Sequence, residues 1–268
     1  MIRPSQLHSL APKLVAASIA VALLIVFGFF ARQTGIDAAM PPPVPDHHTV
    51  IAITCPYAPF FDFHDGGGQE WQLIAAALRL EGQQPEYVYG SYEDAMRYAS
   101  TDYVQGVWVC GGMRPPEEGY YPSVPLLRRN FVVAILAARD LTVNDPAELL
   151  PLDVGVHPDV YRALEPQIPS ALSVSENLRK IPNHVFLATQ LLVGQLDAVI
   201  TEKAVFIEAL RQVPGDTDIN QQINYQQVFE PLYPRILFKD KGLRDRFNDG
   251  WKKVTNEGPE EALEHGKE

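Results

Sequence analysis

The sequence predicts an α/β protein made of two strand-and-helix units that follow an N-terminal membrane helix. Three observations carry this prediction: an uncharged apolar run near the N-terminus, a proline-rich segment after it, and short β-branched runs that alternate with helical patterns. The length of 268 residues allows one large domain or two modest ones. Hydrophobic residues make up 46% and charged residues 21%, which excludes a wholly disordered chain.

The first expected element is a membrane anchor at residues 14–31, a run without any charged residue. A helix needs ~20 apolar residues to cross a bilayer, and ~17 is the lower limit. Cleavable signal peptides usually have a shorter apolar stretch and end in small residues, whereas Arg32-Gln33-Thr34 follows here. We therefore expect an uncleaved signal anchor, with a cleaved signal peptide or a buried core helix as the alternatives.

The charges around this run predict its orientation. Arg3 and Lys13 precede it and only Arg32 closely follows, so the positive-inside rule keeps residues 1–13 in the cytoplasm. The rest of the chain then lies in the periplasm of a bacterium, anchored in the inner membrane or, after cleavage, soluble. Residues 32–48 contain PPPVP and predict an extended linker.

The first strand-and-helix unit begins at residue 49. Short apolar or β-branched runs typical of strands occupy residues 49–55, 87–89 and 104–110. Apolar residues at helical spacing over 71–78 and a capping-box-like start at Ser91 predict the helices between them. Strands joined by helices favour right-handed crossovers and a parallel sheet.

A second unit follows with the same alternation. Strands are expected at 131–137, 154–156 and 196–200, with a helix capped by Asn183 and another at 202–210. A last strand at residues 235–238 and a helix with an apolar face over 243–254 end the pattern.

Four short motifs occur in order along this part of the chain. They are Tyr-Ala-Pro-Phe at 57–60 with Gly-Gln-Glu-Trp-Gln-Leu at 68–73, Pro-Ser-Val-Pro at 122–125, Gly-Gln-Leu-Asp-Ala-Val-Ile-Thr-Glu at 194–202, and Leu-Arg-Asp-Arg-Phe-Asn at 243–248. Together they resemble type II periplasmic solute-binding proteins of the amino-acid class (family 3), in divergent form. The resemblance implies a Venus-flytrap fold, in which two α/β lobes close on a small solute that is often delivered to an ABC importer.

The resemblance also implies the domain boundaries. The C-terminal strand and helix are similar to the segment that returns to the first lobe in that family. Lobe one is therefore expected to combine residues 49–129 with 235–268, and lobe two to comprise residues 130–234. Two separate sheets are expected, and one continuous sheet would contradict this division.

Ligands of open parallel sheets bind outside the carboxyl ends of the strands. Four such ends carry the candidate ligand-binding residues: Tyr57 and Phe60, Met113 and Arg114, His157 and Asp159, and Thr201 and Glu202. They would offer aromatic walls, one guanidinium and carboxylates to a small polar solute. The alternatives are that Tyr57 and Phe60 only pack, that Arg114 is solvated or pairs with Glu117 or Glu118, and that His157 is an ordinary loop residue.

The charge of the expected site depends on one arginine. The family resembled here carries an arginine that binds an α-carboxylate, and this sequence has Glu117 and Glu118 in that stretch. Arg114 is the nearest candidate but is out of register, while Glu202 matches the position that pairs with a ligand amine. Without the arginine the remaining site is acidic, so we expect a cationic or neutral polar ligand rather than a simple anion.

Cys55 and Cys110 end the first and third predicted strands. If these strands are neighbours, their Cα atoms could be ~5–6 Å apart, which is compatible with a disulfide. The periplasm would allow such a bond. Two buried free thiols are the alternative, because free cysteine packs as a small apolar residue.

Other function classes find little support. The net charge of −11 and the absence of a basic cluster exclude a nucleic-acid partner. The sequence has no Gly-x-Ser-x-Gly, phosphate-loop or HExxH motif, so no enzyme, cofactor or metal site is expected. Cys110 and His157 could be drawn as a nucleophile and base, for a lyase or dehydratase on the same fold, but no third orienting residue is evident.

The expected function is membrane-tethered binding of a small polar solute, as the substrate-binding component of an ABC importer with a permease as partner. The alternative is a sensory or accessory module that uses the same cleft, or a degenerate one, to contact another periplasmic protein. The full-length lobes favour the importer, whereas the tether and the missing arginine favour the alternative.

Overall fold

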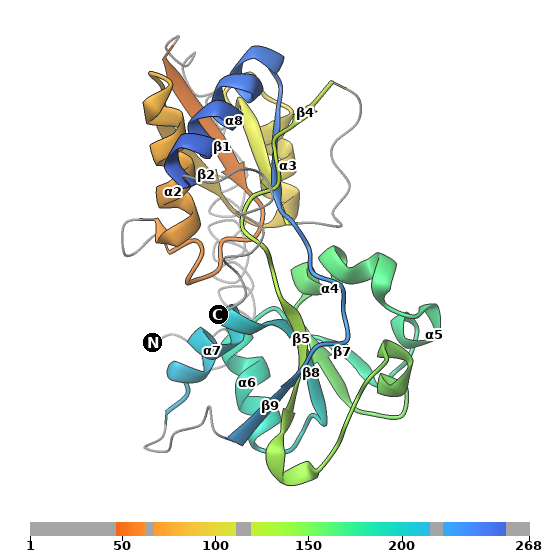
Figure 1. Cartoon of the computed structure of the whole chain (residues 1–268). Helices are drawn as coiled ribbons and strands as arrows, with labels where there is room; N and C mark the ends of the chain where they lie inside the picture. The colour runs from red at the N-terminus through yellow and green to blue at the C-terminus, as the bar shows by residue number, and fades with distance from the viewer. Residues whose placement is uncertain (1–46, 63–66, 111–118, 215–221, 256–268) are drawn as a thin grey trace, which may run out of the picture. The chain divides into compact units, whose positions relative to one another are not determined.

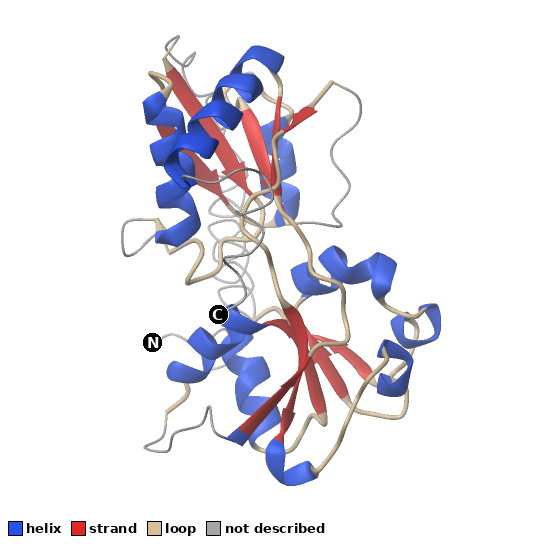
Figure 2. Cartoon of the chain, in the orientation of Figure 1, coloured by secondary structure: helices blue, strands red, loops and turns tan. Residues whose placement is uncertain are grey.

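Two five-stranded sheets with helices packed against them form the described part of the chain (Figures 1 and 2). The computed structural model describes residues 47–62, 67–110, 119–214 and 222–255. The predicted cytoplasmic segment, membrane anchor and nearly all of the linker lie outside these residues. Within the described ranges, no helix has both the length and the apolar character that a membrane crossing requires.

The first sheet has the strand order β2-β1-β3-β10-β4. Its strands are β1 (His48–Ile53), β2 (Gln84–Tyr89), β3 (Gly106–Val109), β4 (Tyr121–Pro122) and β10 (Arg235–Phe238). Strand β1 is parallel to β2 and β3, while β10 is antiparallel to β3 and β4. All of β3 and nearly all of β1 is buried, which suits apolar central strands covered by helices.

Three helices cover the first sheet: α2 (Gly68–Leu80), α3 (Tyr92–Ala99) and α8 (Lys241–Thr255). Helices α2 and α8 lie side by side, and α3 packs against β1 and β3 (Figure 1). A Cβ atom at Gly250 would lie 2.2 Å from the carbonyl oxygen of Ala77, so this close approach of α8 to α2 requires glycine. This contact joins α8 to a residue 173 positions earlier in the sequence (250 − 77 = 173).

The second sheet has the strand order β7-β6-β8-β5-β9. Its strands are β5 (Phe131–Leu136), β6 (Val154–Val156), β7 (Leu178–Lys180), β8 (Ala198–Glu202) and β9 (Ile223–Gln226). The α-helices that accompany it are α4 (Pro158–Leu164), α5 (Ser170–Ser173), α6 (His184–Leu192) and α7 (Lys203–Arg211). Val133 and Ile135 of β5 point into the main core, while Ala134 between them joins a smaller cluster with α6 and α7.

The prediction of parallel sheets is wrong for two strands. β5 is antiparallel to β8 and β9, and β10 is antiparallel to β3 and β4. Each of these strands enters its sheet directly after the chain has left the other sheet, so no helical crossover sets its direction. The short strands β4, β7 and β9 were not expected either, because they lack a long apolar run.

Two chain segments connect the sheets: one leads from β4 to β5 and the other from β9 to β10. They pair where the backbone N–H of Arg129 donates to the carbonyl of Leu232 at 2.8 Å, and the N–H of Leu232 donates back at 3.2 Å. The predicted lobe boundaries at 129/130 and 234/235 fall in these segments. Arg129 therefore lies at the passage from one sheet to the other.

Candidate ligand-binding pocket

One cavity is lined mainly by residues at or just beyond the carboxyl ends of β1, β3, β6 and β8, with further residues from the starts of β5 and α6. It encloses about 390 Å³ of space between atoms, part of which is open to solvent. The first sheet and its loops contribute Cys55, Tyr57, Phe60, Trp108 and Cys110. The second sheet and its helices contribute Phe131, Asp159, Val160, His184, Glu202 and Val205, and Arg129 comes from the connecting segment.

The cavity contains four of the eight predicted ligand-binding residues: Tyr57, Phe60, Asp159 and Glu202. His157 is buried and contacts Tyr57 beside the cavity. Thr201 is fully buried, and its hydroxyl donates to the carbonyl of Glu202 at 3.3 Å, so the structure does not place it with the other lining residues. The remaining two, Met113 and Arg114, lie outside the described residues.

Sequence reasoning missed Arg129, Trp108, Phe131 and His184. Trp108 and Phe131 belong to predicted strands, and their position near a strand end was the one available signal. Arg129 gave no signal of a site residue, because it follows Arg128 in a stretch between the Pro-Ser-Val-Pro motif and a predicted strand that itself resembles no motif.

The start of α2 fixes Phe60 in the wall of the cavity. The N–H of Glu70 donates to the carbonyl of Phe60 at 3.0 Å. Gly68 has a φ of +79°, and a Cβ there would lie 2.5 Å from the same carbonyl oxygen. The glycine of the second motif is thus required for the loop that carries Phe60 to approach the helix.

Arg129 is the buried cation of the site. It is 2% exposed, forms an ion pair through Nη2 with the carboxylate of Glu70, and stacks with its guanidinium carbon 3.2 Å from the ring centroid of Phe60. Nη1 is also buried and has no hydrogen-bond partner among the described residues. This guanidinium can therefore still donate to an acceptor that enters the cavity.

Glu70 is fully buried beneath Arg129. Its other carboxylate oxygen accepts the indole N–H of Trp108 at 3.2 Å. Burial raises the pKa of Glu70, and the Arg129 charge followed by the Trp108 hydrogen bond opposes this shift. The pair joins α2, β3 and the connecting segment.

Glu202 is the buried carboxylate on the opposite side. It is 6% exposed and caps α7 by accepting the N–H of Val205 at 2.9 Å. Burial raises the pKa of Glu202, while the positive charge of Arg129 and then backbone N–H groups lower it. The cavity thus holds a guanidinium and a carboxylate whose opposite charges attract each other.

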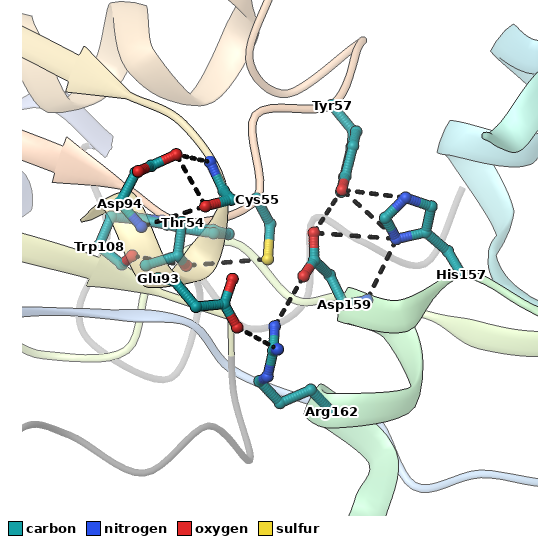
Figure 3. A network of polar contacts seen from close by, with 10 residues as sticks. Thr54, Cys55, Tyr57, Glu93, Asp94, Trp108, His157, Asp159 and Arg162 are labelled. Carbon is teal, nitrogen blue, oxygen red and sulfur yellow. Dashed lines mark hydrogen bonds and ion pairs between the residues drawn. The ribbon is translucent and has the colours of Figure 1, made fainter. Parts of the chain in front are cut away.

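A polar network reaches from one sheet to the other (Figure 3). The hydroxyl of Tyr57 donates to the carboxylate of Asp159 and lies 3.3 Å from Nε2 of His157. Asp159 also accepts from Arg162 at 2.9 Å, and Arg162 donates to Glu93 of α3 at 2.8 Å. Among the described residues, the contacts that join the halves therefore include Tyr57 with Asp159 and His157, and Glu93 with Arg162.

Two imidazoles stack beside Tyr57. The rings of His157 and His184 have centroids 4.4 Å apart and an interplanar angle of 16°, and the Tyr57 ring meets both by its edge. Nδ1 of His157 accepts the N–H of Asp159 at 3.1 Å, which fixes its orientation at the start of α4. Both ring nitrogens of His184 are buried, and neither has a hydrogen-bond partner in the described chain.

Burial sets the protonation of this cluster. It lowers the pKa of His184 to about 3, with the neighbouring His157 adding to the effect. Burial also lowers the pKa of His157, against the attraction of Asp159. The pKa of Tyr57 is raised by burial and then by Asp159, so the hydroxyl stays a donor. At neutral pH the cluster offers neutral donors and acceptors beside the carboxylate of Asp159.

Cys55 and Cys110 are free thiols in the structure, and both are buried. Of the two alternatives left by the sequence, the structure therefore has the unbridged one. Both side chains line the cavity, and the hydroxyl of Thr54 contacts Sγ of Cys55 at 3.7 Å. Within the described ranges, no group of three or more His, Cys, Asp and Glu side chains is arranged to hold a metal ion.

Comparisons with known proteins agree on the fold. No family model matches the sequence, and no curated protein matches it. A histidine kinase sensor domain with similarity to periplasmic binding proteins aligns with a TM-score of 0.63 at 14% identity, over 83% of this chain and 97% of that one. Solved structures with identities this low establish the fold alone.

Two solute-binding proteins are also similar. The substrate-binding protein AbpA of an amino acid ABC transporter from Streptococcus pneumoniae, bound to L-arginine, has a TM-score of 0.58 at 19% identity, over 82% of this chain and 94% of that one. The arginine-, lysine-, histidine-binding protein ArtJ from Geobacillus stearothermophilus has a TM-score of 0.55 at 20% identity, over 78% of this chain and 90% of that one. The predicted type II periplasmic binding fold is thereby confirmed.

Proposed function

We propose that this chain, which has the type II periplasmic binding fold, binds a small polar solute in the cavity between its two sheets, in the periplasm and tethered to the inner membrane. The observation that carries the proposal is the pair of oppositely charged, buried side chains in that cavity. Arg129 keeps an Nη1 without a hydrogen-bond partner among the described residues. Glu202 lines the same cavity and accepts hydrogen bonds from backbone N–H groups.

The side chains favour a ligand with a carboxylate or carbonyl at one end and an amine at the other. The free N–H of Arg129 would bind the acceptor, and Glu202 would bind the amine, since both charged groups gain from a partner in a site of low dielectric constant. The expectation of a cationic or neutral ligand counted no cation except Arg114. Arg129 supplies one, so a zwitterion meets a charge of opposite sign at both ends.

The aromatic walls would hold the body of the solute. Phe60 and Trp108 on one side and Phe131 on the other line the cavity, and such walls are usual in small-molecule sites. Binding is favoured over catalysis by Cys110 and His157, because Nδ1 of His157 already accepts a helix N–H.

A matched ligand series tests the proposal. Full-length protein in detergent is titrated by calorimetry with L-arginine, with its decarboxylated amine and with its deaminated acid, and a thermal-shift screen extends the series to other amino acids, small acids and amines. We expect the zwitterion to bind more tightly than either truncated form. If none of the screened solutes binds, or if binding is the same in Glu202→Gln and Arg129→Lys variants, the proposal is wrong.

The role after binding has two candidates. Import as the receptor of an ABC permease is supported by the full set of strands in both sheets and by the similarity to transporter binding proteins. Sensing is supported by the expected uncleaved anchor and by the similarity to a histidine kinase sensor domain. Solute uptake by cells with and without the gene separates them, because only the importer requires the chain for uptake.

The anchor has its own test. The full-length protein should stay in the membrane fraction after a high-salt wash, because an 18-residue apolar helix cannot be released by salt. A soluble protein whose N-terminus begins near residues 33–40 would show cleavage instead.

A further inference from the structure

The two thiols lie opposite each other on neighbouring parallel strands. In the register of β1 and β3, Ile53 pairs with Trp108, so Cys55 and Cys110, two residues further on, lie at the same level beyond the strand ends. Both side chains line the same cavity, and the neighbouring Cys110 contributes to raising the pKa of the Cys55 thiol. Neighbouring strands lie ~4.7–4.9 Å apart, and bridged Cα atoms are usually ~4.4–6.8 Å apart, so this register is compatible with a disulfide.

The pair belongs to the cavity rather than to the core beneath it. Both thiols line the cavity, and each residue is 7% exposed. Neither thiol has a part in the ligand binding proposed above. A pair of neighbouring thiols in a cavity wall, in the oxidising periplasm proposed above, is a site for reversible oxidation.

We propose that Cys55 and Cys110 form a redox-active dithiol in the cavity wall, and that its conversion to a disulfide shifts Tyr57 and weakens the contact between the two halves of the protein.

The oxidation balances with a disulfide as the oxidant, either glutathione disulfide or the disulfide of a thiol oxidase. One cysteine loses its proton and attacks a sulfur of the oxidant, which forms a mixed disulfide and releases one thiol. The second cysteine, deprotonated in turn, attacks the mixed disulfide and releases the second thiol. The pair loses two electrons and two protons, and the oxidant is reduced to two thiols.

Closure of the protein would protect the reduced pair. Burial raises the pKa of the Cys55 thiol, and the contacts with Cys110 and the charge of Asp159 raise it further. Asp159 belongs to the second half, whereas Cys55 belongs to the first. The thiolate needed for exchange is therefore disfavoured while Asp159 is near, and exchange proceeds mainly when the halves separate.

The bridge would act on Tyr57 through the backbone. The N–H of Tyr57 donates to the carbonyl of Cys55 at 3.0 Å, so the two residues move as one turn. Forming a bond of about 2.05 Å between two sulfurs that are unbonded in this structure pulls this turn toward β3. The hydroxyl of Tyr57 then leaves its position against Asp159 and His157.

The first experiment counts thiols at defined redox potentials. Full-length protein in detergent is equilibrated with a series of glutathione and glutathione disulfide ratios, quenched with acid, denatured and labelled, and its mass is measured. We expect one transition from two labelled thiols to none, with an unmodified mass two hydrogens lower. Two labelled thiols in the most oxidising buffer, or stable glutathione adducts in place of the bridge, would overturn the proposal.

The single variants Cys55→Ser and Cys110→Ser serve as controls. Each can form only a mixed disulfide with glutathione, so neither should lose two hydrogens at any ratio. If the wild-type protein formed glutathione adducts over the same redox range as the single variants, the two cysteines would react independently, contrary to the proposal.

The second experiment measures amide hydrogen exchange in the oxidised and the reduced protein. We expect faster exchange in peptides covering residues 57–62 and 158–164 after oxidation, and no such change in Cys55→Ser under the same conditions. Equal exchange in both redox states would exclude the effect on Tyr57. Neither experiment uses a solute, so its result is independent of the ligand-binding function proposed above.

Discussion

The two sheets have the same topology and different chemistry at their strand ends. Each has two parallel pairs followed by two antiparallel pairs, so β1 corresponds to β6, β3 to β8, and β10 to β5. β1 is followed by Cys55 and Tyr57, whereas β6 is followed by His157 and Asp159. A shared topology therefore brings equivalent positions to one cavity, while the side chains there remain free to differ because they lie beyond the ladder of backbone hydrogen bonds.

The buried charges differ in the same way. On the side of the first sheet, the charge of Glu70 is neutralised by an ion pair with Arg129, and the indole of Trp108 donates to its other oxygen. On the side of the second sheet, Glu202 is held by backbone N–H groups at the start of α7. We expect the first arrangement to be sensitive to loss of one partner and the second to tolerate neutralisation, and this contrast can be tested.

The largest effect is expected from Arg129→Met, which leaves the carboxylate of Glu70 buried without its cation. Breaking a buried pair usually costs about 3–5 kcal/mol of unfolding free energy, measured here by chemical denaturation of the full-length protein. Removing both charges in Arg129→Met with Glu70→Gln should restore part of the loss. If the unfolding free energy of Arg129→Met lies within about 1 kcal/mol of the wild-type value, the Arg129–Glu70 pair does not stabilise the fold as expected.

Glu202→Gln is the matched change on the other side. The amide oxygen can still accept the N–H of Val205, so the unfolding free energy should change by less than about 1 kcal/mol. A loss as large as that of Arg129→Met would remove the contrast between the two sheets.

Tyr57→Phe should have the next largest effect, because it keeps the ring against both imidazoles and removes only the donor to Asp159. Hydrogen bonds to charged groups contribute about 1.5–3 kcal/mol, and the exposed Tyr98→Phe serves as the control with no expected change. Unchanged stability in Tyr57→Phe would mean that this bond does not join the halves in solution.

His184→Gln tests how the unfolding free energy depends on pH. The pKa of His184 is near 3 in the folded protein and about 6.5 when unfolded, so the unfolded state binds the extra proton between these values. Wild-type stability should therefore fall as pH decreases below about 6.5, on the order of 1 kcal/mol per pH unit from this group. Below the folded pKa this loss is complete.

The variant must be compared with the wild type over the whole pH range, because other ionisable side chains lie near this ring. Tyr57 and His157 contact His184, and Asp159 accepts a hydrogen bond from Tyr57. All three residues are present in both proteins. The difference between the two stability profiles should be flat above about pH 6.5 and should slope below it. A difference that is flat throughout contradicts the prediction.

Among the variants at contacts between the halves, the smallest effect is expected from Glu93→Gln, which neutralises one partner of the ion pair with Arg162. The Glu93 side chain is 70% exposed and that of Arg162 is 33% exposed, so their ion pair should contribute at most about 1 kcal/mol. The effect should shrink in high salt, whereas that of Tyr57→Phe should persist. Salt-dependent unfolding of the two variants distinguishes these cases, and equal salt dependence would contradict the assignment.

The sequence by itself determined most of the secondary structure. Local signals identified α3 from the capping box at Ser91, α6 from the cap at Asn183, and the strands at 131–137, 154–156 and 235–238 within a residue of their observed bounds. These elements are set by neighbours in the chain, so local pattern suffices. The motif resemblance indicated the fold, and the strand-end rule indicated Tyr57, Phe60, Asp159 and Glu202.

Only the tertiary structure decided which groups face each other. Arg129 carries no local mark of a site residue, and it lies in the cavity because a connecting segment places it between Glu70 and Glu202. His184 opens a helix by its sequence and becomes a cavity residue through its stack with His157. The antiparallel direction of β5 and β10 likewise follows from passage between the sheets. Contacts between residues far apart in the chain depend on tertiary packing, and a local sequence pattern does not encode that packing.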